Sequence, residues 1–291
     1  MLNRRRESCQ GFLYVAPSLV LILVFSLIPI LMSFYFSFTD YNVLQPPQWA
    51  GLKNYLRMFK DPYVRAALKN TVVFTLVTVP VQTILSLVIA AVIAEFFNNR
   101  FGNFIKSSLF VPVIASAILV GTLWFTLLSP RGVINIILKF FHIPTVNWLG
   151  GKMTSMVSIC MVSIWKNVGY FLVIYFAGIM DIPRSLYEAA EVDGATPVQR
   201  FFHITLPGLS HVTYLVVTLG TIWSFQVFDL VYTMTGGGPG SSTMTLVLNI
   251  YNAAFKERSM GYASAIAVLM FLFVILISGI QKLFLKGGDD E

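Results

Sequence analysis

The sequence predicts an all-α integral membrane protein with six transmembrane helices. Of its 291 residues, 56% are hydrophobic and only 11% are charged, and the mean hydropathy is +0.76. A soluble globular domain carries about 25% charged residues, so this composition excludes an ordinary soluble enzyme. A disordered regulator is also excluded, because it needs low hydrophobicity and high charge. The 14% of aromatic residues suit the two interfaces of a bilayer.

Six stretches that are nearly free of charge define the expected spans. Each is long enough to cross a hydrocarbon layer, which takes about 20 apolar residues. The stretches are 8–39, 70–94, 107–130, 153–180, 201–228 and 259–281, and only the fourth contains a charge, at Lys166. The apolar part of the first, 12–38, is about twice as long as the apolar region of a signal peptide. We therefore expect a retained anchor.

Three consecutive arginines set the expected orientation. Arg4, Arg5 and Arg6 precede the first span and favour a cytoplasmic N-terminus. Even with this cluster included, the Lys and Arg residues outside the spans divide almost evenly, nine inside and ten outside, so the total does not set the orientation and we rely on the cluster before the first span. With six spans the C-terminus also lies in the cytoplasm, which makes the chain a multi-pass protein of the cell membrane.

The connecting segments differ in character. Residues 56–68 are expected to form an amphipathic surface helix, and the apolar run 133–141 is too short to span, so it is interfacial or re-entrant. The glycine-rich loop 236–240 opens an external connection, 235–258. No metal site is predicted, because the cysteines and histidines lack ligand spacing. These residues are Cys9, Cys160, His142, His203 and His211.

The most polar connection, 181–207, predicts two short helices at the membrane surface. The first runs from about Ser185 to Asp193, and Gly194 suits its C-terminal end. Thr196 and Pro197 suit the N-cap and first position of the second helix. This segment is either an amphipathic loop or a docking surface for a soluble partner, which small side chains would allow to approach closely.

One motif in this segment resembles a known family. Glu188-Ala189-Ala190, followed by Gly194, Ile204 and Leu206-Pro207, matches the EAA signature of inner-membrane permeases of binding-protein-dependent ABC importers. Other stretches resemble the carbohydrate branch of that family, specifically the first permease of its pair. These stretches are 14–17, 38–41, 49–55, 70–71, 230–239, 243–255 and 261–265. The resemblance covers the whole chain and implies the type I ABC importer permease fold.

The resemblance also implies domains and partners. Residues 1–69 would hold the N-terminal tail, first helix and external loop, 70–285 the permease core, and 286–291 a cytoplasmic tail. The partners implied are a second homologous permease, two ATP-binding subunits, an extracytoplasmic sugar-binding protein and the lipid bilayer, with no nucleic acid. The ATPase contact would be made by Glu188, Ala189, Ala190, Asp193 and Gly194, with Glu188 as the ionic partner.

No catalytic residue, metal or cofactor is expected in this chain. It has no G-x-x-x-x-G-K-[ST] phosphate loop, so ATP hydrolysis would belong to separate partner subunits. The alternatives are a secondary transporter and a membrane receptor or structural protein that is not coupled to ATP. A secondary transporter would be expected to show inverted repeats and several ionisable residues inside its spans.

Polar residues inside the fourth and fifth spans are candidates for the substrate pathway. Such groups are costly in a membrane and usually face a cavity or a partner helix. The candidates are Ser163, Lys166, Asn167 and Tyr170 in the fourth span and Gly220, Trp223 and Ser224 in the fifth. The alternative is that they hold helices together. Asp229, at the end of the fifth span, is expected to be structural, and the role of Lys166 and the identity of the sugar or sugar derivative stay open.

Overall fold

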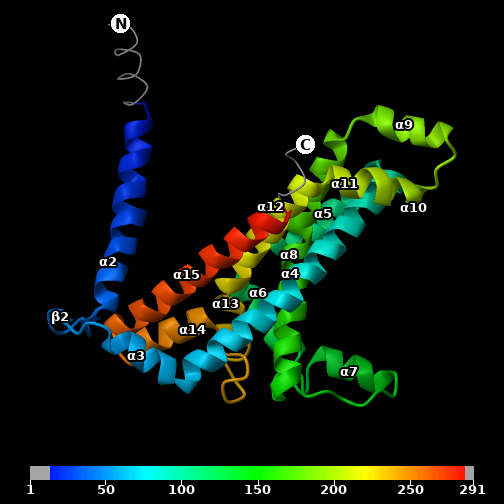
Figure 1. Cartoon of the computed structure of the whole chain (residues 1–291). Helices are drawn as coiled ribbons and strands as arrows, with labels where there is room; N and C mark the ends of the chain where they lie inside the picture. The colour runs from blue at the N-terminus through cyan, green and yellow to red at the C-terminus, as the bar shows by residue number, and fades with distance from the viewer. Residues whose placement is uncertain (1–13, 286–291) are drawn as a thin grey trace, which may run out of the picture. The chain divides into compact units, whose positions relative to one another are not determined.

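The computed structural model describes residues 14–285 and is helical apart from one short strand pair (Figure 1). Arg4, Arg5, Arg6 and Cys9, as well as the expected tail 286–291, lie outside the described residues. The chain divides into two compact units. Unit 1 contains the chain up to Asp61 together with Ile250–Leu269, and unit 2 contains Pro62–Asn249 and the chain from Met270 onward.

Unit 1 begins with one long apolar helix, Tyr14–Ser37. Its middle is a π-helical turn, η1 (Leu23–Leu27), and its end is α2 (Ile28–Ser37). The π turn ends two residues before Pro29, whose missing amide hydrogen interrupts regular α-helical bonding.

A small polar arrangement follows this helix within unit 1. The strands β1 (Thr39–Asp40) and β2 (Gln48–Trp49) pair antiparallel, and α3 (Lys53–Lys60) follows them. The buried Asn54 side chain donates to the carbonyl oxygens of Ser37 and Thr39 at 3.0 and 2.8 Å. These bonds hold α3 against the end of α2.

Unit 2 contains most of the helices. They are α4 (Pro62–Phe96), α5 (Arg100–Ile114), α6 (Ala117–Leu127), α7 (Val133–Phe140), α8 (Lys152–Asp181), α9 (Arg184–Val192), α10 (Pro197–Arg200), η2 (Phe201–Thr205), α11 (Leu206–Gly208), α12 (Ser210–Phe225) and α13 (Asp229–Met234). The helices α14 (Leu246–Tyr251) and α15 (Met260–Leu285) each have residues in both units, and η3 (Asn252–Lys256) belongs to unit 1.

The core of unit 2 is built on α4 and α8, which pack along each other (Figure 1). Helix α5 packs on α8, and α12 packs on α4. Gly169 of α8 allows one of these contacts, because a Cβ added there would lie 2.0 Å from the carbonyl oxygen of Leu109 in α5. Small residues allow such close approach between membrane helices.

Within residues 14–285, four helices are long and apolar enough to cross a membrane: Tyr14–Ser37, α4, α8 and Met260–Leu283. Two bent pairs, α5 with α6 at 97° and Pro197–Gly208 with α12 at 69°, raise this number to the expected six if each pair counts as one span. The continuous third span expected over 107–130 is wrong. It breaks at Ala115, whose ψ of 140° is extended. Pro112 lies just before this break and cannot donate to the helical ladder.

Two other expectations are corrected. The surface helix 56–68 is divided, because Asp61 is extended before Pro62, and α4 then begins at Pro62. Asp229 does not end the fifth span but begins α13. The connection 235–258 contains α14 and η3. The run 133–141 forms the short helix α7.

Candidate functional site

The predicted pair of short helices in segment 181–207 is confirmed. Helix α9 ends at Val192, and Gly194 adopts a left-handed conformation with a φ of +77°. Thr196 caps α10 in a capping box with Gln199, and Pro197 occupies the first turn. We call residues 184–208 the coupling hairpin. Figure 1 shows it at the opposite end of α8 from α7.

The five residues expected to contact an ATPase lie near the turn of the coupling hairpin. Glu188, Ala189, Asp193 and Gly194 are exposed, and Ala190 is half-buried. Nothing lies within 4 Å of a Cβ added at Gly194. The Glu188 carboxylate forms no ion pair within residues 14–285. The turn therefore presents an open, small-residue surface with a free acidic group beside it.

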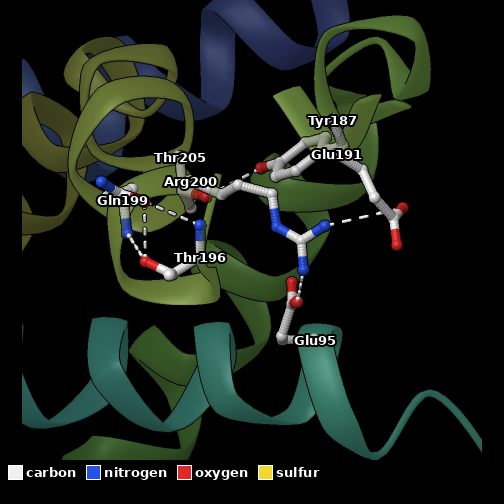
Figure 2. Close-up of polar contacts among 7 residues, drawn as sticks. All are labelled: Glu95, Tyr187, Glu191, Thr196, Gln199, Arg200 and Thr205. Carbon is white, nitrogen blue, oxygen red and sulfur yellow. Dashed lines mark hydrogen bonds and ion pairs between the residues drawn. The ribbon is translucent and has the colours of Figure 1, made fainter. Parts of the chain in front are cut away.

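Arg200 organises the inner side of the coupling hairpin, as Figure 2 shows. Its Nη2 lies 2.5 Å from Oε1 of Glu95 at the end of α4, and its Nη1 lies 3.6 Å from Oε2 of Glu191 on α9. The side chain of Arg200 is only 14% exposed, against 29% for Glu95 and 75% for Glu191. One guanidinium thus links three helices.

A second contact ties the two arms of the coupling hairpin together. The hydroxyl groups of Tyr187 and Thr205 are hydrogen-bonded at 2.9 Å (Figure 2). The Nδ1 of His203 lies 2.9 Å from the backbone carbonyl oxygen of Gln199, one helical turn earlier. The hydroxyl contact connects α9 to η2, and the His203 contact lies within the continuous helix formed by α10 and η2.

A mainly apolar cavity of about 640 Å³ lies between the coupling hairpin and the ends of α4 and α8. Val92 and Phe96 of α4 and Phe202 of η2 contribute to its lining. Glu95, Glu191 and Arg200 contribute its ionic groups. Side chains do not fill this space, so the hairpin is held there by polar contacts as well as by packing.

Two of the candidate pathway residues pack against α4. The Ser224 hydroxyl lies 3.2 Å from that of Thr78, and Ser224 is buried. A Cβ added at Gly220 would lie 2.7 Å from Nε2 of Gln82. These positions bring α12 close to α4, which favours the helix-packing interpretation for Gly220 and Ser224.

Other candidate pathway residues form a partly exposed group. The rings of Tyr170 and Trp223 have centroids 4.9 Å apart, and Trp223 is 37% exposed. Asn167 lies one helical turn from Ser163, with 3.4 Å between its Nδ2 and the Ser163 Oγ. Asn167 and Tyr170 are half-buried, whereas Ser163 is buried. The structure therefore joins α8 and α12 through an aromatic pair with amide groups nearby.

Lys166 contacts the break in the third span. Its Nζ lies 3.4 Å from the carbonyl oxygen of Val113, one residue before the end of α5. The last carbonyls of a helix lack intrahelical partners and attract cations. This contact gives Lys166 a structural role at the C-terminus of α5, which the sequence left open.

The sequence reasoning missed Arg200, Glu95 and Asn70. The Asn70 side chain donates to the carbonyl oxygens of Ser241 and Met244 at 2.7 and 3.0 Å, and so holds the loop that follows 236–240. The signal for Asn70 was its place in the resemblance to sugar permeases. Glu95 and Arg200 gave no signal beyond being charges at the ends of apolar stretches.

No three His, Cys, Asp or Glu side chains within residues 14–285 gather as a metal site would require. The arrangement instead offers an exposed hairpin attached to a bundle of apolar helices. Residues 10–287 match the family described as binding-protein-dependent transport system inner membrane component. The chain belongs to this family.

Relatives of this permease include transport proteins from bacteria and archaea. It is 34% identical to the lactose transport system permease protein LacF of Rhizobium radiobacter, over 96% of this chain and 94% of LacF. It is 33% identical to the trehalose/maltose transport system permease protein MalF of Thermococcus litoralis, over 93% of this chain and 91% of that protein.

The permease fold is also found in a solved structure. A chain of a bacterial ABC transporter involved in the import of the acidic polysaccharide alginate has a TM-score of 0.88 to this permease. The two chains are 21% identical, and the match covers 99% of each. The type I permease fold is confirmed, and the chain is a multi-pass membrane protein and a transport subunit.

Proposed function

We propose that this permease is one half of the membrane channel of an ATP-driven importer for a sugar or sugar derivative. The observation that carries the proposal is the coupling hairpin, with its open surface at Gly194 and the free carboxylate of Glu188. The transport of lactose and of trehalose or maltose by relatives that match nearly the whole chain supports the substrate class.

The proposed complex contains a second permease, two ATP-binding subunits and an extracytoplasmic sugar-binding protein. In this arrangement the coupling hairpin and both termini lie in the cytoplasm. Closure of the ATP-binding subunits moves the hairpin, and the helices attached to it turn between inward-open and outward-open states. Ala189 and Gly194 let an ATPase surface approach the hairpin backbone, while Glu188 pairs with a cation on it.

The substrate route is proposed to pass the partly exposed group on α8 and α12. Tyr170 and Trp223 offer aromatic faces for the apolar side of a sugar ring, and Asn167 offers an amide for its hydroxyl groups. Gly220, Ser224 and Lys166 support this surface from behind through their contacts with α4 and α5. Ser163 supports it by its position beside Asn167.

The test is a reconstituted complex in which Gly194 is replaced. Gly194→Arg places a long side chain where nothing lies within 4 Å in the permease alone, so it should block the ATPase rather than the fold. We expect loss of ATP-dependent sugar uptake and of ATPase co-purification, with the permease still present in the membrane.

Gly51→Arg is the matched control. Gly51 also has a positive φ, of +56°, and nothing within 4 Å of an added Cβ, so both variants carry similar backbone strain. The control should keep co-purification of the ATPase. Normal uptake by Gly194→Arg, or failure of the unaltered permease to bind an ATPase, contradicts the proposed function.

A further inference from the structure

The coupling hairpin has covalent connections to only two of its neighbouring helices. It follows α8 through Ile182 and Pro183, both of which are non-helical, and it enters α12 through a 69° bend at Leu209. Helix α4 has no chain connection to the hairpin, although it packs along both α8 and α12. Any displacement of the hairpin therefore needs another contact to reach α4 directly.

Packing of α9 against other helices provides little means of passing a displacement of the hairpin to α4. Helix α9 has no extensive packing partner among the described helices, unlike α4, α8 and α12. An apolar cavity of about 640 Å³ lies between the hairpin and the end of α4. The apolar contact that remains is made by partly buried side chains, Tyr187, Phe201 and Ile204, against a buried cluster that includes Ile93 of α4. Close-packed interiors transmit displacement well, whereas a void transmits none across it.

One ion pair crosses this region. The Arg200 guanidinium meets Glu95 at 2.5 Å through one terminal nitrogen and approaches Glu191 at 3.6 Å through the other. Arg200 and Glu95 are largely shielded from solvent, so salt and water weaken their pairing less than that of an exposed pair. The planar guanidinium also fixes direction, which a lysine ammonium does not.

We propose that Arg200 is a positioning residue that locks the coupling hairpin to α4, so that the hairpin and α4 move as one body. Glu95 is its principal partner, and Glu191 steadies α9 against the same guanidinium. This inference rests on the proposed function, in which the hairpin receives the motion of an ATPase. It adds that α4 follows the hairpin through a side-chain latch made of Arg200 and Glu95.

The experiment measures the number of sugar molecules imported per ATP hydrolysed, in proteoliposomes that contain the whole complex and the binding protein. Arg200→Gln and Glu95→Gln should each lower this ratio by about fivefold or more, the range typical of a lost coupling contact. ATP hydrolysis and subunit composition should be retained. The exchanged pair Glu95→Arg with Arg200→Glu should restore much of the ratio, because it rebuilds an ion pair between the same two positions. A lowered ratio in a fully assembled complex is the result that a merely structural role would not predict.

Two variants sharpen the result. Glu191→Gln should have a smaller effect than Glu95→Gln, because Glu191 is more distant and 75% exposed. Arg100→Gln is the matched control, since Arg100 is exposed and forms no ion pair within residues 14–285. It should leave the ratio unchanged.

The latch is overturned if Arg200→Gln and Glu95→Gln import as much sugar per ATP as the unaltered complex. Loss of subunit assembly in both variants, without rescue by the exchanged pair, also overturns it in favour of a structural role. Failure of the proposed function looks different, because the unaltered permease would then show no ATP-dependent import at all.

Discussion

The coupling hairpin and the wall formed by α4, α5 and α8 each depend on a glycine, but the two glycines have opposite surroundings. At Gly169 in the wall, an added Cβ would lie 2.0 Å from a backbone carbonyl oxygen of the neighbouring helix. At Gly194 in the hairpin, it would meet nothing within 4 Å. The first glycine lets two helices of the same chain touch, and the second leaves the surface of the turn open.

The same contrast appears in the polar contacts. Besides apolar packing, the hairpin is held by one hydroxyl pair and by a shielded guanidinium between two carboxylates. The wall is held by apolar packing and by small residues that permit close backbone approach. The region proposed to receive the motion of an ATPase is therefore built differently from the helices that it is proposed to move.

Adding a larger side chain where α8 contacts α5 should have the largest effect on stability. Gly169→Val forces α8 away from Leu109, and overpacking of this kind costs about 1–3 kcal/mol or more. We expect a strongly lowered unfolding temperature in detergent and little protein in the membrane. Gly279→Val, where an added Cβ meets nothing within 4 Å, is the matched control and should be nearly neutral. Equal stability of the two variants would remove the contrast.

Removing an exposed ring from α12, which packs on the wall, should act on transport instead. Trp223 is 37% exposed beside Tyr170, so Trp223→Ala removes an aromatic face more than a buried contact. We expect an increase of about tenfold in the KM for uptake, equivalent to about 1.4 kcal/mol, with unfolding temperature little changed. A large fall in stability with unchanged KM would instead make Trp223 a packing residue.

Ser224, the residue next to Trp223, should show the smallest effect of the three. Its replacement should change stability and leave the KM unchanged, the reverse of the pattern for Trp223→Ala. Ser224→Ala removes the contact with Thr78, and such interhelical hydrogen bonds average about 0.6 kcal/mol in membranes. A small loss of thermal stability with an unchanged KM is therefore expected. A raised KM in Ser224→Ala would place this residue on the substrate route rather than behind it.

The hairpin could be predicted from the sequence because its signals are local. Gly194, Thr196 and Pro197 fix the turn through conformational preferences that hold in any protein. The pair of Arg200 with Glu95 could not be predicted, because 105 positions separate the two residues and neither carries a motif.

The wall was predicted less completely for a related reason. A charge-free stretch indicates that a segment lies in the membrane but not whether it bends, so the break at Ala115 was not expected. Nor does it show which helix face meets a neighbour. The sequence therefore could not distinguish the two roles among the pathway candidates in α12. The structure shows that Ser224 packs against α4, whereas Trp223 lies beside Tyr170.

Side-specific labelling of single cysteines tests most directly whether the coupling hairpin lies in the cytoplasm. Val192→Cys places a thiol on an 88% exposed position of the hairpin, and Thr145→Cys places one on an exposed position between α7 and α8. Both variants are made in a chain whose Cys9 and Cys160 are replaced by serine. A membrane-impermeant maleimide should label Thr145→Cys in intact cells and Val192→Cys only after the membrane is opened. Labelling of Val192→Cys in intact cells would contradict the account.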